Sequence, residues 1–278
     1  MKALALSVLA MAWAALAEPG PAPSSRTTLL AAHRGGAALW PENSLLAFRN
    51  AVALGVDYLE LDVHLSRDGE VMVIHDPTLE RTTTGQGAVR DHTRAELRGL
   101  ALRDGRGDVT AERIPTLDEV AALAAASGRG LLLEIKPGPG KVAYPGIEER
   151  VLGILDRHAM TASTVVMAFE RETWTRVRAL RPDVQAGALY SARALEPGPG
   201  VARAFTDARA TGVAFVGLAY ALVGADAVAA ARRAGVRLGA WTVNDADAMR
   251  RLIDRGIDVL ITDRPDAAKA ILSERRSP

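Results

Sequence analysis

Short apolar runs rich in β-forming residues alternate with helical segments along most of this chain, and no other feature restricts its fold as much. The predicted strands span residues 29–34, 58–63, 71–75, 130–135, 163–169, 184–190, 212–218, 236–243 and 258–262. The predicted helices span residues 44–54, 117–127, 147–158, 172–180, 200–210, 225–234, 245–255 and 264–274. Strands that alternate with helices form parallel sheets, and eight such units predict an α/β fold, the (β/α)8 TIM barrel.

Local signals at the ends of the predicted helices agree with this reading. Asn43 or Ser44 can cap the start of the first helix, and Asn244 or Asp245 the start of the seventh. Gly55 stands where the first helix needs a C-terminal cap. An open, doubly wound sheet is the competing fold, but it usually has fewer units, and no dinucleotide-type glycine fingerprint follows the first strand.

Residues 76–115 interrupt the alternation. This segment is rich in glycine and charge, it has no strong apolar period, and we expect a short helix near residues 93–99. We interpret it as a small insertion after the second strand, carried on one βα loop. The barrel domain is therefore predicted to span residues 29–275.

The first residues differ in character from the rest of the chain. Lys2 precedes an uncharged apolar run over residues 3–14, and Ala15-Leu16-Ala17 has the small-x-small form of a cleavage site. Residues 1–17 are thus predicted to be a signal peptide and 18–28 a flexible lead-in, while a membrane anchor or a buried helix is the alternative. We expect an exported protein, periplasmic or secreted, with no stable membrane anchor after cleavage.

The overall composition narrows the classes of partner. Lysine and arginine total 34 against 33 acidic residues, so no electrostatic feature favours nucleic acid or an anionic membrane. The chain has no cysteine, which excludes disulfides, thiolate metal sites and cysteine nucleophiles. A small anionic molecule remains a suitable partner, because a basic site can sit inside a protein of balanced charge.

Charged side chains and histidines gather at the carboxyl ends of the predicted strands, where barrel enzymes hold their catalytic groups. Glu60 and Asp62 are two residues apart on one strand, so both point to the same face. The full set of candidates is His33, Arg34, Glu60, Asp62, His75, Glu134 and Lys136. We expect these side chains to meet at one mouth of the barrel.

The chemistry of this set is that of phosphodiester cleavage. Three carboxylates at one mouth repel one another unless a hard divalent cation lies between them, and Ca²⁺ or Mg²⁺ prefers such oxygen ligands. Arg34 offers a planar fork of donors for phosphate, and Lys136 offers a point charge. The two histidines can serve as general base and general acid, and the sequence leaves open which is which.

Short motifs in a fixed order include all of these side chains. They are Ala32-His33-Arg34-Gly35-Gly36, Pro41-Glu42-Asn43-Ser44, Tyr58-Leu59-Glu60-Leu61-Asp62-Val63, Val73-Ile74-His75-Asp76, Leu133-Glu134-Ile135-Lys136, Trp241-Thr242-Val243-Asn244 and Thr262-Asp263. In this set the chain resembles the glycerophosphodiester phosphodiesterase family over roughly residues 29–272. The ordered set of motifs is more specific for this family than any single motif is.

The resemblance implies a role for each matching position. It implies a metal site at Glu60, Asp62 and Glu134, acid and base at His33 and His75, and phosphate contacts at Arg34 and Lys136. It also places Trp241 beside the glycerol of the substrate, although the same tryptophan could be a core aromatic. The implied reaction is metal-dependent hydrolysis of glycerophosphodiesters to sn-glycerol 3-phosphate and an alcohol.

Two other functions are compatible with such a barrel. A phospholipase D-like enzyme acting on lysophospholipids or sphingolipids would share the metal site but should have an exposed apolar lip beside it. A barrel that binds phosphorylated ligands without turnover would normally lack a histidine or a carboxylate of the set. Both histidines and all three carboxylates of the set are present here, which favours an enzyme.

Overall fold

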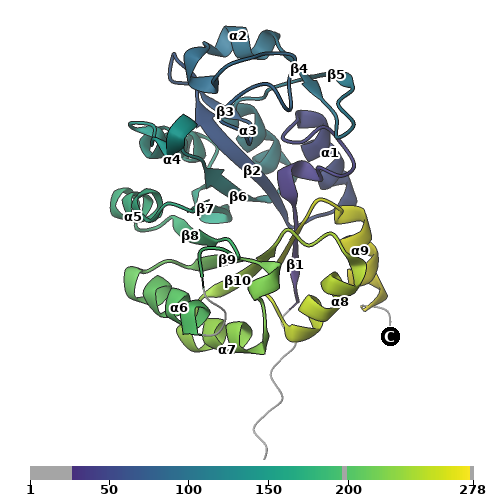
Figure 1. Cartoon of the computed structure of the whole chain (residues 1–278), viewed down its shortest axis with the longest axis vertical. Helices are drawn as coiled ribbons and strands as arrows, with labels where there is room; N and C mark the ends of the chain where they lie inside the picture. The colour runs from purple at the N-terminus through teal and green to yellow at the C-terminus, as the bar shows by residue number, and fades with distance from the viewer. Residues whose placement is uncertain (1–26, 196–198, 276–278) are drawn as a thin grey trace, which may run out of the picture.

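Eight parallel strands form a closed barrel in the computed structural model, which describes residues 27–195 and 199–275 (Figure 1). The barrel strands are β1 (Leu29–Ala32), β2 (Tyr58–Leu65), β6 (Gly130–Ile135), β7 (Thr164–Ala168), β8 (Gln185–Tyr190), β9 (Phe215–Ala219), β10 (Arg237–Trp241) and β11 (Val259–Thr262). Strand β1 closes the ring because it pairs with β2 on one side and β11 on the other. The (β/α)8 prediction is confirmed.

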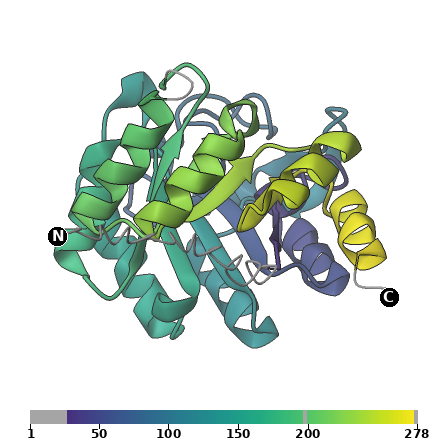
Figure 2. The ribbon, with the colours of Figure 1, turned by 90° about the horizontal axis from the view of Figure 1, so that it is seen from below.

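Helices form the outer ring, as the view from below shows (Figure 2). They are α1 (Leu45–Leu54), α3 (Leu117–Ser127), α4 (Ile147–Arg157), α5 (Arg171–Leu180), α6 (Pro199–Thr211), α7 (Ala225–Ala234), α8 (Ala246–Arg255) and α9 (Pro265–Glu274). Of the two possible caps of α1, the structure uses Ser44, whose Oγ accepts the backbone N–H of Ala47 at 3.0 Å. Gly55 ends α1 in the left-handed conformation, with φ 74°.

Two apolar layers fill the barrel and its surroundings. The larger one lies between the strands and the helices, and a smaller cluster fills the barrel interior. Phe215 is at the centre of the inner cluster, and Gly239 on the neighbouring strand makes room for it, since a Cβ there would lie 2.4 Å from the Phe215 ring. Because the interior is packed, ligands can reach functional groups only at the rim.

The predicted insertion follows the second strand. It contains α2 (Arg94–Gly99), β4 (Ala101–Arg103) and β5 (Val109–Arg113), and it has its own small apolar core. Short 3-10 turns complete the described elements: η1 (His33–Gly35), η2 (Val89–Asp91), η3 (Pro139–Lys141), η4 (Thr161–Ser163) and η5 (Tyr220–Leu222).

One predicted strand is not part of the barrel. Strand β3 (Val71–Val73) pairs antiparallel with β2, with Val73 opposite Val63. The short connection between them allows a hairpin, whereas a parallel crossover needs a dozen or more residues. His75 thus reaches the barrel mouth because a hairpin doubles back, and not because a barrel strand ends there.

The N-terminal predictions lie outside the described residues. The signal peptide over 1–17 and most of the lead-in over 18–28 fall in the part that the structure does not describe. Among the described helices, none combines the length and the apolar character that crossing a bilayer requires.

Candidate active site

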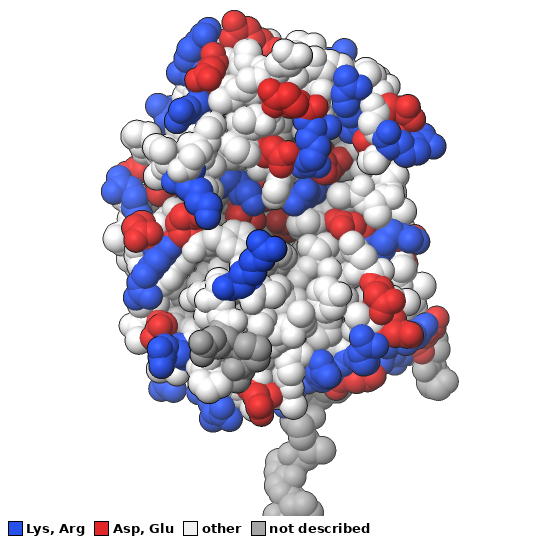
Figure 3. Space-filling view, viewed as in Figure 1, with Lys and Arg blue, Asp and Glu red and all other residues white. Residues whose placement is uncertain are grey.

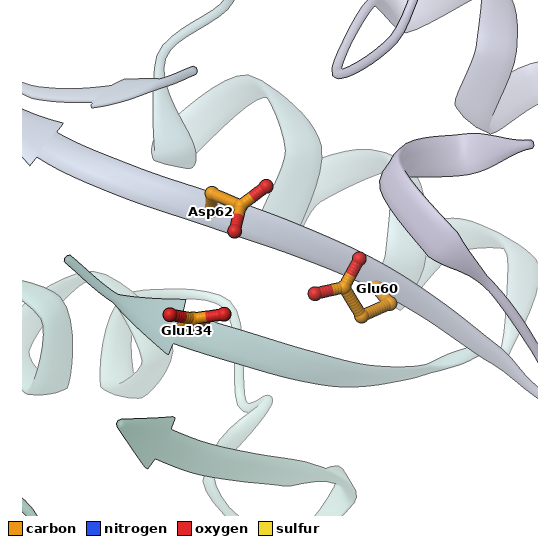
Figure 4. Close-up of side chains that lie close together, drawn as sticks. All are labelled: Glu60, Asp62 and Glu134. Carbon is orange, nitrogen blue, oxygen red and sulfur yellow. The ribbon is translucent and has the colours of Figure 1, made fainter. Parts of the chain in front are cut away.

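Three acidic side chains converge at the carboxyl end of the barrel. Glu60 and Asp62 project from the same face of β2, and Glu134 lies on β6 directly opposite Asp62 (Figure 4). All three side chains are buried, and one oxygen from each lies within 4.8 Å of the other two. The register of two adjacent parallel strands therefore brings the three predicted carboxylates together.

The electrostatics of this cluster suit a bound cation. Burial raises the pKa of Glu60 and of Glu134 above the ordinary range for glutamate. Burial acts in the same direction on Asp62, but the charges of Lys136 and Arg34 outweigh it and lower the pKa of Asp62. Asp62 Oδ1 is buried and accepts no hydrogen bond from any described residue. A hard divalent cation with oxygen ligands fits these three carboxylates.

Arg34 lies beside the acidic cluster because of an unusual backbone turn. The residue follows β1 inside η1 with φ 51°, and its backbone N–H donates to Glu60 Oε2 at 2.8 Å. Its side chain donates from Nη1 to Glu42 Oε1 at 3.1 Å, and Nε lies 3.4 Å from Asp62 Oδ2. The guanidinium is therefore held next to the cluster with donors that a phosphate could use.

Lys136 provides the second positive charge, from the residue directly after β6. Its Nζ lies 2.8 Å from Glu134 Oε1 and 3.5 Å from Asp62 Oδ1. Burial lowers the pKa of Lys136, but the charges of Asp62 and Glu134 outweigh burial and raise the pKa above the ordinary lysine value. Lys136 is therefore positively charged at neutral pH.

His33 is oriented by a carboxylate that follows the last barrel strand. Its Nδ1 lies 2.6 Å from Asp263 Oδ1, and Asn244 Nδ2 donates to the other oxygen of that carboxylate at 2.6 Å. Burial lowers the pKa of His33, but the charge of Glu60 and the hydrogen bond to Asp263 outweigh it, so the pKa rises above 6.5. These surroundings stabilise the protonated imidazolium relative to a free histidine, and Nε2 lies 3.9 Å from Glu60 Oε2.

His75 has a matching partner in the next residue. Its Nδ1 lies 2.6 Å from Asp76 Oδ1, and Arg81 holds that carboxylate through Nε and Nη2 at 2.6 and 3.0 Å. Arg81 also donates twice to Glu42, at 2.8 Å each. Because Glu42 accepts from Arg34, alternating charges connect His75 to the guanidinium beside the acidic cluster.

The opposite wall of the pocket is apolar. Trp241, the last residue of β10, lines it beside Phe169, and the two rings meet edge to face with centroids 5.5 Å apart. Lys136 Nζ lies 5.8 Å from the Phe169 ring centroid. The pocket therefore pairs a charged half with an aromatic half, and charged side chains gather in the hollow at the centre of this face (Figure 3).

All eight residues predicted for the site surround this one pocket or its acidic cluster. Sequence reasoning gave no role to Asp263, Asp76, Arg81 or Phe169. Three of these carried a usable signal, because Asp263 and Phe169 each follow a barrel strand directly and Asp76 adjoins a predicted histidine. Arg81 lies in the insertion within the motif Leu79-Glu80-Arg81-Thr82-Thr83, which also matches the family, but the motif gave no indication that Arg81 holds Asp76 and Glu42.

Comparison with known proteins agrees with this geometry. The model of the Glycerophosphoryl diester phosphodiesterase family matches residues 33–267. A glycerophosphodiester phosphodiesterase of Caldanaerobacter subterraneus subsp. tengcongensis is 35% identical over 240 residues, which cover 86% of this chain and 95% of that protein.

Solved structures agree in fold as well. An Agrobacterium tumefaciens protein, described as a candidate glycerophosphoryl diester phosphodiesterase, has a TM-score of 0.83 at 29% identity, with 91% of this chain and all of that one covered. An Oleispira antarctica phosphodiesterase in complex with the product sn-glycerol-3-phosphate has a TM-score of 0.75 at 26% identity. That match covers 89% of this chain and 97% of the other.

Proposed function

The chain belongs to the glycerophosphoryl diester phosphodiesterase family, and we propose that it hydrolyses its substrate in the pocket at the barrel mouth. As a family member it is a glycerophosphodiester phosphodiesterase, an enzyme that acts on small glycerophosphodiesters. The products are sn-glycerol 3-phosphate and an alcohol. One observation supports the assignment to this pocket. Two histidines, each paired with an aspartate, lie around the same pocket as the acidic cluster and the positively charged side chains of Arg34 and Lys136.

Glu60, Asp62 and Glu134 are the residues that would hold a divalent cation, with Ca²⁺ or Mg²⁺ as the proposed ion. Asp62 Oδ1, which accepts no hydrogen bond within the described residues, and the raised pKa values of the two glutamates support this. When bound, such an ion would polarise a phosphoryl oxygen and neutralise the negative charge that develops during cleavage.

Arg34 and Lys136 are the proposed phosphate contacts. Both are charged and border the acidic cluster, and both line the pocket. Arg34 is fixed on its far side by Glu42, so its remaining N–H groups can hold a phosphoryl oxygen with little loss of side-chain freedom. Trp241 and Phe169 would cover the apolar edge of the glycerol or of the alcohol.

In this proposal one histidine accepts a proton and the other donates one. The Lys136 ammonium can only donate, so Nε2 of His75, 3.1 Å from Lys136 Nζ, is the acceptor and carries a lone pair. That is the state of a general base, and His75 would take a proton from the attacking water. His33, whose surroundings raise its pKa and so stabilise the imidazolium, would give a proton to the leaving alcohol oxygen.

The phospholipase D-like alternative has less support. It requires an apolar lip for acyl chains, whereas among six large apolar side chains exposed in the described residues only Phe169 lines the pocket. An assay of the released alcohol, choline or ethanolamine, with glycerophosphocholine, glycerophosphoethanolamine and lysophosphatidylcholine separates the two functions. Release from the first two substrates supports the proposal, and turnover of the lysolipid alone contradicts it.

We also propose that the enzyme is exported to the periplasm or secreted. The charged start, the apolar run and the small-x-small site within residues 1–17 support export. Mass spectrometry of the protein outside the cytoplasm should give a mature N-terminus at Glu18, and a chain that still begins with Met1 would contradict cleavage.

A further inference from the structure

His64 is a buried histidine that the proposed chemistry does not use. It lies on β2, two residues beyond Asp62, and its side chain is completely shielded from solvent. Its Nε2 lies 3.0 Å from the backbone carbonyl oxygen of His75, and its Nδ1 lies 3.0 Å from the Tyr144 hydroxyl.

The partners of His64 determine where its proton lies. A carbonyl oxygen can only accept, so Nε2 must carry the hydrogen and donate it to His75. The ring then has a bare Nδ1, which accepts the hydroxyl hydrogen of Tyr144. One tautomer of a neutral imidazole satisfies both contacts, and the direction of donation runs from Tyr144 through His64 to His75.

The hydrogen bond from His64 gives the His75 carbonyl a donor that the backbone does not provide. Strand β3 ends at Val73, and the last backbone bond between the two strands is donated by Ile74 to the Asp62 carbonyl at 3.0 Å. Among the described residues, no backbone N–H donates to the carbonyl of His75. His64 provides the donor, and it does so from the strand that also holds Glu60 and Asp62.

We infer that Tyr144 and His64 form a positioning pair that fixes the backbone at His75 and thereby aims its ring. The peptide that His64 holds joins His75 to Asp76, which is the carboxylate bound to Nδ1 of the same histidine. The positions of His75 and of Asp76 therefore both depend on the hydrogen bond that His64 donates to this carbonyl. The inference rests on the proposed role of His75, and it adds two residues that touch neither substrate nor metal.

Variants of His64 separate positioning from packing. In His64→Gln an amide N–H can still donate to the carbonyl, whereas His64→Leu fills the space without a donor. We expect kcat of His64→Leu to fall by about tenfold or more with KM changed less than about twofold, since small misplacement of a reacting group slows the chemical step. The glutamine variant should stay within about threefold of the wild-type kcat.

Tyr144→Phe provides a second variant should the leucine variant fail to fold. It removes only the hydroxyl, and Tyr58→Phe is the matched control, because Tyr58 uses its hydroxyl at the other end of the barrel to accept from Arg237. We expect kcat to fall by about threefold or more in Tyr144→Phe and to stay unchanged in Tyr58→Phe. Equal values of kcat in these two variants, or in His64→Leu and His64→Gln, would overturn the inference.

Nuclear magnetic resonance gives a readout that does not depend on turnover. Histidine ¹⁵N signals of the wild type should show His64 protonated at Nε2 alone, and the His75 ring signals should shift in Tyr144→Phe but not in Tyr58→Phe. A His64 protonated at Nδ1, or His75 signals unmoved in Tyr144→Phe, contradicts the pair. An active His75→Ala variant would instead overturn the proposed function, while these signals would still decide the positioning contact.

Discussion

The Asp263 carboxylate lies 2.6 Å from Nδ1 of His33, although the two residues are 230 positions apart in the chain. Closure of the barrel between β1 and β11 brings them together, since Ala32 pairs with Thr262 immediately before each of them. The general acid of the proposed mechanism therefore depends on the same pairing that closes the fold.

Asp263→Asn should weaken the acid without disturbing the barrel. The carboxylate helps to raise the pKa of His33, so its loss lowers that pKa and leaves less imidazolium at a given pH. The high-pH limb of the kcat profile should move to lower pH, and kcat at its optimum should fall by about 100-fold or more. A pH–rate profile checks this, and a limb that stays in place would argue against His33 as the acid.

Arg81→Met tests the chain of charges that reaches His75. The variant removes the donors that hold Asp76 and Glu42, and we expect kcat to fall about tenfold, which corresponds to about 1.4 kcal/mol of lost positioning. Arg106→Met is the control, because Arg106 makes an exposed ion pair with Asp104 in the insertion. Steady-state kinetics should show a loss in the first variant alone, and equal rates in both would mean that Arg81 is only a surface residue.

Metal binding should release protons at neutral pH. Burial raises the pKa values of Glu60 and Glu134 to about 7 and about 8 in the ion-free protein, so near neutral pH each is partly protonated and a bound cation displaces those protons. Calorimetric titration with Ca²⁺ or Mg²⁺ should give an enthalpy that varies with the ionisation enthalpy of the buffer. A binding enthalpy that does not vary with the buffer would contradict the raised pKa values of the two glutamates.

Glu60→Gln tests the ligand set itself. The substitution keeps the size of the side chain and removes a charged ligand, and we expect metal affinity to fall by at least about tenfold. Glu274→Gln, at an exposed ion pair on α9, should titrate like the wild type. A chelator should abolish turnover, and added divalent ion should restore it; unchanged titration of Glu60→Gln would remove that residue from the site.

Gly239→Ala should destabilise the fold by about 1–3 kcal/mol, because the new methyl would overlap the ring of Phe215 inside a packed barrel. Gly153→Ala is the matched control, since nothing lies within 4 Å of a Cβ at that position in α4. There the change should stabilise the protein by about 0.5–1 kcal/mol through higher helix propensity. Denaturant unfolding measures both, and equal effects would contradict the described interior packing.

Much of the fold could be predicted because its signals are local. The apolar runs, the N-cap Ser44 and the C-cap Gly55 can each be recognised from neighbouring residues in the sequence. The period of a strand likewise places Glu60 and Asp62 on one face. The antiparallel course of β3 was not predicted, because an apolar run looks the same in either direction.

The support around the histidines could be predicted less well. Asp263 and His33 meet only when the barrel closes, and Arg81 meets Glu42 from 39 positions away in the chain. The role of His64 also depends on tertiary contacts, with the carbonyl of His75 after β3 and with Tyr144 from the loop after β6. Each of these roles includes a contact between segments that are far apart in the chain, and a local sequence pattern does not indicate such a contact.

The release of sn-glycerol 3-phosphate from glycerophosphocholine tests the central claim most directly, with wild type, His33→Ala and His75→Ala compared in the presence of divalent cation. The account predicts turnover by the wild type and a loss of kcat of about 10²–10⁴-fold in each variant, with unchanged circular dichroism. Near-normal turnover by both folded variants would contradict it.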